Sequence, residues 1–281
     1  RRRTAGTTKK YIEVLVVNDF ARYTAFGGQD GLVQLATHTV AVMNAVTAIY
    51  RKAPSDGAVF PYTVQVVLVA QHTFVSSDPW PNVKMVGAEV AEGDLLEAFL
   101  TWTSAEMAAG KLPENDNRVL LSGRDFVDST VGYAFLSSLC EVSRSGSINM
   151  CGATNNLMAD CATTVAHELG HNFGMTHDSG SCPQTGYVMA ATALNGEIVD
   201  QFSSCSVSDI TKFFSQTYQK NGECLENKPS RVFGDPVCGN GFREDGEDCD
   251  CGSSDCSVID PCCNGASCKF LDSSYHCSDS V

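Results

Sequence analysis

Three of the six histidines in this chain fall within one run of twelve residues, His167-Glu168-Leu169-Gly170-His171-Asn172-Phe173-Gly174-Met175-Thr176-His177-Asp178. If the first part of the run is helical, His167 and His171 stand one turn apart on the same face, with Glu168 beside them. Gly174 can adopt a backbone conformation that ends the helix, so that His177 can turn back as a third ligand. The run therefore predicts three nitrogen ligands around one metal ion.

Zinc held by three protein nitrogens and a water is typical of catalytic sites, whereas structural zinc sites are closed by four protein ligands. The spacing HExxHxxGxxH constrains five positions and is the signature of the metzincin metalloproteases. In such a site the ion lowers the pKa of its water to about 7, and Glu168 can take the proton and pass it to the leaving amine. We therefore expect catalytic Zn²⁺ and peptide hydrolysis. The alternative, three core imidazoles without a shared partner, is costly.

The full run HELGHNFGMTHD resembles the reprolysin (adamalysin or ADAM) branch of the metzincins. Asp178 carries this distinction, because astacins characteristically have Glu and matrix metalloproteases Ser after the third histidine. The segment Gly186–Ala190 (GYVMA) resembles the turn that the family places beneath the zinc, with Met189 as its methionine. The resemblance implies an α/β metzincin catalytic domain with a mixed, mostly parallel twisted sheet and flanking helices.

Hydrophobic patterning agrees with an α/β sheet, because strand-like and helix-like segments alternate. We expect strands at 11–17, 62–70 and 118–122, and helices at 31–50, 94–109, 159–173 and 206–219. Ser206 is a plausible N-cap of the last helix, with Asp209 three residues on.

The resemblance also locates the substrate site. Residues 130–139 resemble the family's edge strand above the active site, and 147–150 could pair beside it; a peptide can add to such an edge as an extra strand. The alternative for Gly132 is a bulge or a turn. The pocket for the residue after the scissile bond would lie between the Met189 loop and the start of the catalytic helix. The expected substrate-binding residues are Gly132, Tyr133, Ala134, Thr164 and Val165.

Fourteen cysteines are difficult to keep as free thiols, so we expect a secreted protein or an extracellular ectodomain. Eight of them crowd into the tail from Cys238 on, which is typical of a small disulfide-stapled module. Zinc clusters are a weaker alternative, because the tail lacks two paired CxxC units and has one histidine. The family resemblance implies the pairs Cys140–Cys224 and Cys182–Cys205. Cys151 and Cys161 have no clear counterpart in the family and remain as a third pair.

The segment 227–235 (NKPSRVFGD) is polar and turn-rich, and we place the catalytic domain at 1–227, a linker at 228–236 and a second domain at 237–281. The second domain resembles the start of a disintegrin-like domain in three places: Val237–Gly241 (VCGNG), Gly246–Gly252 (GEDCDCG) and Cys262-Cys263. No Arg-Gly-Asp occurs, so integrin binding is not supported.

Charge and hydropathy restrict the partners. The formal net charge is −14, and residues 225–281 hold eleven of the 33 acidic but only four of the 19 basic residues, which argues against nucleic acid. We find no apolar run that approaches the length of a membrane span. Arg1-Arg2-Arg3 resembles the remains of a proprotein-convertase site, which would imply an inhibitory prodomain; an arbitrary boundary is an equal alternative. The expected partners are protein or peptide substrates.

Structural Ca²⁺ is implied by two sets of oxygen donors that match the family's calcium sites. The first consists of Glu13, Asp116, Asn227 and the carbonyl of Cys224. The second consists of Asn240, Glu244, Glu247 and Asp250, with the carbonyls of Val237 and Phe242. Six oxygens are within the range that calcium accepts. The alternative is that these carboxylates are solvated surface groups.

Together these features predict a zinc endopeptidase of the reprolysin type. The main rival is a catalytically silent adhesion or binding protein of the same architecture. Relatives without activity usually lack the base or a ligand, yet Glu168 and all three histidines are present. A third interpretation, a disulfide-rich scaffold with structural zinc, needs a fourth protein ligand in place of the water.

Overall fold

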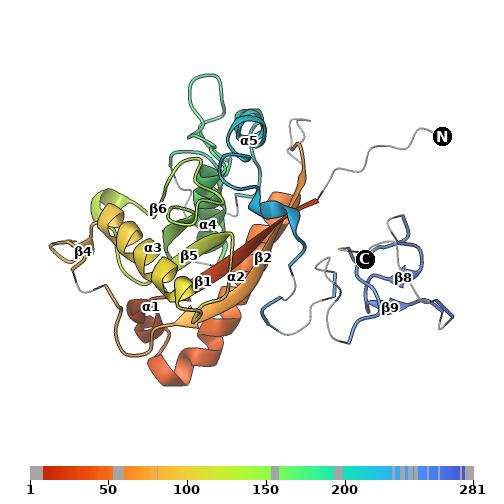
Figure 1. Cartoon of the computed structure of the whole chain (residues 1–281), viewed down its shortest axis with the longest axis horizontal. Coiled ribbons are helices and arrows are strands. Elements are labelled where there is room, and N and C mark those ends of the chain that lie inside the picture. Colours follow the sequence, from red (N-terminus) through yellow and green to blue (C-terminus); the bar gives the residue numbers. More distant parts are fainter. Residues whose placement is uncertain are drawn as a thin grey trace. The chain divides into compact units, whose positions relative to one another are not determined.

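The computed structural model describes residues 9–52, 60–80, 82–152, 158–192, 199–229, 232–234, 238–239, 243, 246–251, 253–258, 260–272 and 274–275. The chain divides into two compact units, Arg1–Arg231 and Val232–Val281. The break between them falls inside the segment expected to be a linker. The first unit contains a central sheet with helices on both sides (Figure 1).

The sheet of the first unit has five strands in the order β2-β1-β5-β7-β6. Four of them run parallel, and β6 pairs antiparallel with β7 at one edge. The strands are β1 (Lys9–Asn18), β2 (Thr63–Thr73), β5 (Asn117–Ser122), β6 (Gly132–Ala134) and β7 (Gly146–Met150). The predicted mixed, mostly parallel sheet is thereby confirmed.

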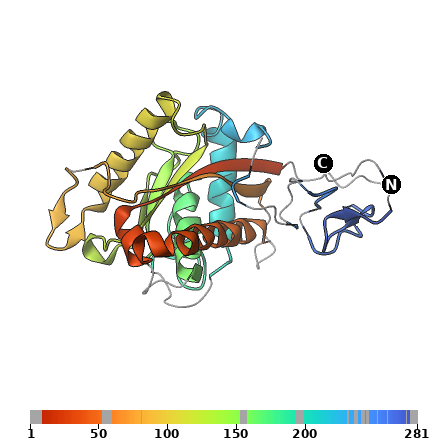
Figure 2. The same cartoon turned by 90° about the horizontal axis from the view of Figure 1, so that it is seen from below.

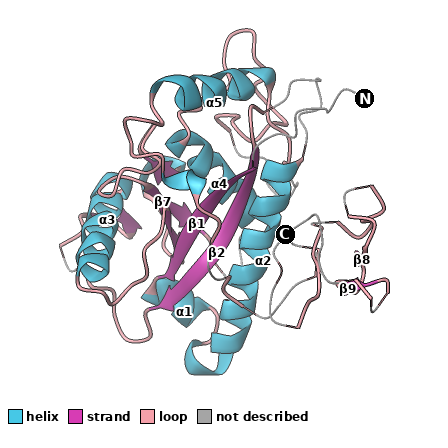
Figure 3. Ribbon diagram, turned by 45° about the vertical axis from the view of Figure 1, so that its right-hand side comes forward, coloured by secondary structure: helices cyan, strands magenta, loops and turns pink. Residues whose placement is uncertain are grey.

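Two layers of helices cover the sheet because the side chains of β1 alternate between its faces. Ile12, Val14 and Val16 pack toward α2 and α4, whereas Leu15 and Val17 pack toward α3. Figures 2 and 3 show the helices on the two sides of the sheet. The helices are α1 (Phe20–Ala25), α2 (Leu32–Arg51), α3 (Glu92–Ala108), α4 (Met158–Asn172) and α5 (Ser204–Gln216); a short hairpin, β3 (Met85–Val86) and β4 (Glu89–Val90), precedes α3. Neither α1 nor this hairpin was predicted from the sequence.

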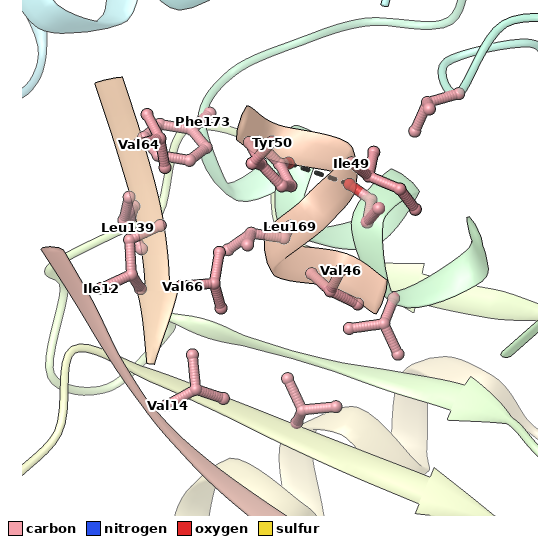
Figure 4. Packing of buried hydrophobic residues seen from close by; sticks show 14 of the residues in the cluster. Ile12, Val14, Val46, Ile49, Tyr50, Val64, Val66, Leu139, Leu169 and Phe173 are labelled. Atoms are coloured by element: carbon pink, nitrogen blue, oxygen red, sulfur yellow. Dashed lines mark hydrogen bonds between the residues drawn. The ribbon is translucent and has the colours of Figure 1, made fainter. Parts of the chain in front are cut away.

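The larger hydrophobic core includes the apolar face of α4 (Figure 4). Tyr50 of α2 is buried there, and its hydroxyl donates to the carbonyl of Ala166 at 2.9 Å. Leu169 and Phe173 fill the space between α4 and the neighbouring elements. Burial of each such side chain stabilises the fold by about 1.5–3 kcal/mol, so α4 is fixed on its apolar face.

The helical segment Gly28–Arg51 contradicts the expectation that no apolar run approaches the length of a membrane span. It is long and apolar enough, by composition, to cross a membrane, with a mean hydropathy of 1.4. In the structure, Leu35, Val42, Val46 and Ile49 on its apolar side are buried in the core. This packing accounts for the apolar composition of the helix within the domain.

The edge strand is shorter than expected, because only Gly132–Ala134 pair with β7. Asp128 and Ser129, just before the strand, have φ values of 56° and 60°. Ser137, just after it, has φ 57°, and its N–H donates to the carbonyl of His171 at 2.8 Å. A left-handed backbone cannot continue a strand, so the chain turns toward α4 instead.

Helix α5 begins before the expected residue. Its N-cap is Ser203, whose hydroxyl oxygen accepts from the N–H of Ser206 at 3.2 Å. Ser206 is therefore inside the helix, and the prediction that it is the cap was wrong by one turn. Asp209, expected to complete the cap, contacts Thr176 instead.

Six disulfides are present in the described part of the chain. The first unit contains Cys140–Cys224, Cys151–Cys161 and Cys182–Cys205, which are the pairs that the sequence analysis expected. The second unit contains Cys238–Cys268, Cys249–Cys263 and Cys251–Cys256, together with a hairpin of β8 (Cys263–Asn264) and β9 (Lys269–Phe270). Cys262 is free among the described residues, and Cys277 lies outside them.

Candidate active site

Helix α4 presents one apolar face and one polar face. Ala162, Val165, Ala166 and Leu169 recur at helical spacing and are buried in the core. His167 and His171 lie on the other side, where both line a cavity. The helix ends at Asn172, and Gly174 has φ +81°, a conformation that glycine adopts without strain. The chain then returns so that His177 faces the first two histidines.

The three histidines converge through their Nε2 atoms. The Nε2 of His177 lies 3.1 Å from that of His167 and 3.2 Å from that of His171. Nitrogens bound to one tetrahedral zinc at about 2.0–2.1 Å would stand roughly 3.3 Å apart. The arrangement therefore fits a zinc ion.

Hydrogen bonds orient two of the rings for this purpose. His167 donates from Nδ1 to the carbonyl of Val188 at 2.6 Å, and His171 donates from Nδ1 to the carbonyl of Met175 at 2.8 Å. A neutral ring with its proton on Nδ1 has a lone pair on Nε2. A proton on Nε2 of His177 could form a hydrogen bond with only one of the Nε2 lone pairs of His167 and His171. A metal cation, in contrast, can accept the lone pairs of all three nitrogens. Such backbone acceptors are typical of metal-binding histidines.

The protonation states agree with metal binding. The pKa of His167 is lowered to about 3, chiefly by burial and in part by the neighbouring His171 and His177, while the hydrogen bond to Val188 opposes this shift. Burial also lowers the pKa of His171. Both rings are therefore neutral at physiological pH, as ligands must be.

Glu168 lies beside these ligands in the same cavity. Its side chain is buried, and burial raises its pKa to about 8. A divalent cation nearby would favour the carboxylate form. A carboxyl group with such a pKa, placed at a cavity that can hold a metal, has the properties of a general base.

The cavity has a volume of about 660 Å³ and lies between α4, the edge strand β6 and the Met189 loop. Gly132, Tyr133, Ala134 and Thr164 line it, as expected of substrate-binding residues. Val165 does not, because it is fully buried in the core. Thr163, the residue before Thr164 on the same helix, lines the cavity instead.

Gly132 is neither a bulge nor a turn. It pairs in register with Asn149 of β7. Its lack of a side chain instead leaves room for Glu168, since a β-carbon at position 132 would lie 2.8 Å from Cγ of Glu168.

Hydrogen bonds that were not predicted from the sequence hold the segment on both sides of the third histidine. The N–H of Met175 donates to the carbonyl of Gly170 at 2.9 Å. The N–H of Asp178 donates to the carbonyl of Met189 at 2.8 Å, and its carboxylate accepts from the hydroxyl of Ser203 at 2.5 Å. Backbone acceptors carry no signal in the residue types, so sequence reasoning could not find them.

Met189 is fully buried and lies next to Gly170 of α4. A β-carbon at Gly170 would lie 3.3 Å from the terminal carbon of Met189, so the glycine allows the methionine to pack closely against the helix between the two histidines. Met189 thus packs against α4 between His167 and His171.

Three residues of the first expected calcium set, Glu13, Asp116 and Asn227, are joined by hydrogen bonds through Glu13. The N–H of Glu13 donates to the carboxylate of Asp116 at 2.8 Å, and the side-chain amide of Asn227 donates to the carboxylate of Glu13 at 2.9 Å. Of the second set, Val237, Asn240, Phe242 and Glu244 lie outside the described residues. Glu247 and Asp250 are described, and Asp250 accepts from the N–H of Gly239 at 2.8 Å.

Convergent neutral imidazoles, with a buried carboxyl group beside them and a sheet edge above, place the chain among the metalloprotease-type domains. Comparison with known sequences narrows this class. Residues 10–229 match the Reprolysin (M12B) family zinc metalloprotease, and the chain belongs to this family. Membership implies a catalytic zinc, and His167, His171 and His177 fit a zinc site.

Individual relatives agree with the family. Disintegrin and metalloproteinase domain-containing protein 9 of Homo sapiens is 31% identical over 274 residues, which is 96% of this chain and 30% of that protein. The chain therefore spans less than a third of this relative. A solved structure described as a chaperone-substrate complex matches with a TM-score of 0.48 and 13% identity, and the match covers 76% of this chain and 35% of that chain.

Proposed function

We propose that the chain is an extracellular zinc-dependent endopeptidase that hydrolyses internal peptide bonds of proteins. The observation that carries this proposal is the convergence of three Nε2 atoms in one cavity with Glu168. His167, His171 and His177 would hold the ion. When bound, zinc supplies a polarising charge for a substrate carbonyl and for a water molecule.

Glu168 is the proposed general base. Its buried carboxylate can take a proton from the attacking water and give it to the departing amine. The low-dielectric surroundings strengthen its interactions with charge that develops nearby. Proton transfer by a positioned group typically contributes about 10²–10⁴-fold to the rate.

The edge strand β6 is the proposed substrate platform. It ends the sheet on the side of the cavity, and its residues Gly132–Ala134 line that cavity. A peptide that adds to this edge is held by main-chain hydrogen bonds and depends little on most side chains. Specificity would then come from the cavity walls, which include Thr164 and the loop around Val188.

A structural calcium ion at Glu13, Asp116, Asn227 and the Cys224 carbonyl is part of the proposal. Two carboxylates and an amide oxygen are ligands that calcium prefers. Crowding of Glu13 and Asp116 favours a cation between them. The tail set, which lies largely outside the described residues, stays a prediction, as does a disintegrin-like identity for the second unit.

The rival is a silent binding protein of the same family. A fourth protein ligand would favour structural zinc, but the described residues offer three histidines at this cluster. The deciding experiment incubates the pure chain with a peptide library, with and without a zinc chelator. We expect internal cleavage that chelation abolishes and zinc restores. Absence of cleavage by a zinc-loaded, folded chain would favour the rival.

A further inference from the structure

Asp209 of α5 contacts the segment between the second and third histidines. Its Oδ2 accepts from the N–H of Thr176 at 3.2 Å and from the Thr176 hydroxyl at 3.0 Å. Its Oδ1 accepts from Lys212 at 2.9 Å. The carboxylate is only 17% exposed and lies 33 residues from Thr176 in sequence, outside the histidine motif.

The Thr176 N–H belongs to the same peptide group as the Met175 carbonyl. That carbonyl accepts from Nδ1 of His171 at 2.8 Å. The carboxylate of Asp209, this peptide group and the His171 ring therefore form one continuous chain of hydrogen bonds, which ends at Nε2. Hydrogen bonds in such chains polarise one another, and a bond to a charged group is roughly twice as strong as a neutral one.

The same peptide group leads directly to His177. Thr176 is held twice by Asp209, and Met175 on its other side is held by Gly170. The position of His177 relative to His171 thus depends on a carboxylate from another helix.

We propose that Asp209 is a positioning residue of the metal centre, which orients His171 through the Met175–Thr176 peptide group and fixes the approach of His177. This inference rests on the proposed function only in taking the three histidines as zinc ligands. Partners of this kind typically change metal affinity by about 10–100-fold.

The test measures zinc affinity of the full chain by competition with a chromophoric chelator, for the parent and for Asp209→Asn and Asp209→Ala. Asparagine has nearly the same shape but no charge, whereas alanine removes the acceptor as well. We expect the zinc dissociation constant to rise about tenfold or more in both variants. The visible spectrum of the cobalt-substituted protein should also change, because the ligand field reports the geometry of the ligands.

Lys212→Gln on the same helix is the matched control, because it removes the ion pair of Asp209 but leaves both bonds to Thr176. Its zinc affinity should stay within about twofold of the parent, well short of the effect of a lost partner. A fall as large as that of Asp209→Asn would overturn the proposal, since the effect would then come from α5 in general. Unchanged affinity in folded Asp209→Asn would also overturn it. If Asp209→Ala does not fold, Asp209→Asn decides.

Peptide cleavage measured in parallel separates this proposal from the proposed function. A parent chain that binds zinc tightly but cleaves no peptide would refute the endopeptidase and leave the role of Asp209 standing. Cleavage by the parent, with equal zinc affinity in Asp209→Asn, would refute the role of Asp209 alone.

Discussion

Gly132 of the edge strand lies directly against the side chain of Glu168. A β-carbon at position 132 would stand 2.8 Å from Cγ and 2.9 Å from Cδ of the glutamate. The carboxyl group is therefore confined between α4 and the strand that lines the cavity. Only a residue without a side chain leaves it this space.

Gly132→Ala should displace the proposed base while leaving the zinc ligands in place. A misplacement of about 1 Å can reduce the rate of a catalysed reaction on the order of 100-fold. We expect kcat/KM to fall by a factor of this order with unchanged zinc content, measured by peptide hydrolysis and elemental analysis. Gly93→Ala is the control, since no atom lies within 4 Å of a β-carbon there. Full activity in Gly132→Ala would contradict the assigned position of Glu168.

Glu168→Ala should separate metal binding from chemistry. We expect zinc to remain bound and turnover to fall at least about 100-fold, as is typical for loss of a general base. His167→Ala should lose zinc as well, because it removes a ligand. Turnover numbers compared at matched zinc content check the assignment, and equal rates for Glu168→Ala and the parent would rule it out.

The proposed calcium site should make stability depend on pH. The pKa of Asp116 is raised to about 7, chiefly by burial and in part by the Glu13 carboxylate, while the hydrogen bond from the N–H of Glu13 opposes this shift. This pKa lies above the unfolded value of about 3.9. The stabilisation that the protonated Asp116 carboxyl contributes to the fold is therefore complete below about pH 4 and is lost as the pH rises through about 7. Calcium can replace the proton, so its stabilising effect should grow over the same range.

Thermal unfolding at pH 5 and pH 7.5, in calcium and in a calcium-selective chelator that spares zinc, measures this effect. We expect a larger rise in Tm with calcium at pH 7.5, and its loss in Asp116→Ala. Superimposable curves, together with no bound calcium by elemental analysis, would refute both proposed calcium sites.

Peptide mapping under non-reducing conditions should recover Cys140–Cys224, Cys151–Cys161 and Cys182–Cys205 from the first unit. On the chain-entropy model, closing the 84-residue loop of Cys140–Cys224 stabilises the fold by about 4–5 kcal/mol. The Cys140→Ser, Cys224→Ser double variant should unfold at a clearly lower denaturant concentration. Any linkage between these six cysteines and the tail would contradict two independent units.

The sequence by itself determined the class of site and much of the fold. The spacing of His167, His171 and His177 follows from helical periodicity and one glycine, both of which are local properties. The buried strands and α2 were predictable for the same reason, because the spacing of apolar residues along the chain indicates the type of element and its buried face.

Tertiary structure alone decided which groups surround that site. The fit of Gly132 against Glu168, the carbonyls that orient His167 and His171, and the contact of Asp209 with Thr176 join residues far apart in the chain. No local pattern encodes such contacts, because they depend on how the packed core sets α4 against β6 and α5. The same packing buries Val165, and the edge strand ends early, where the family resemblance implied a cavity wall and a longer strand.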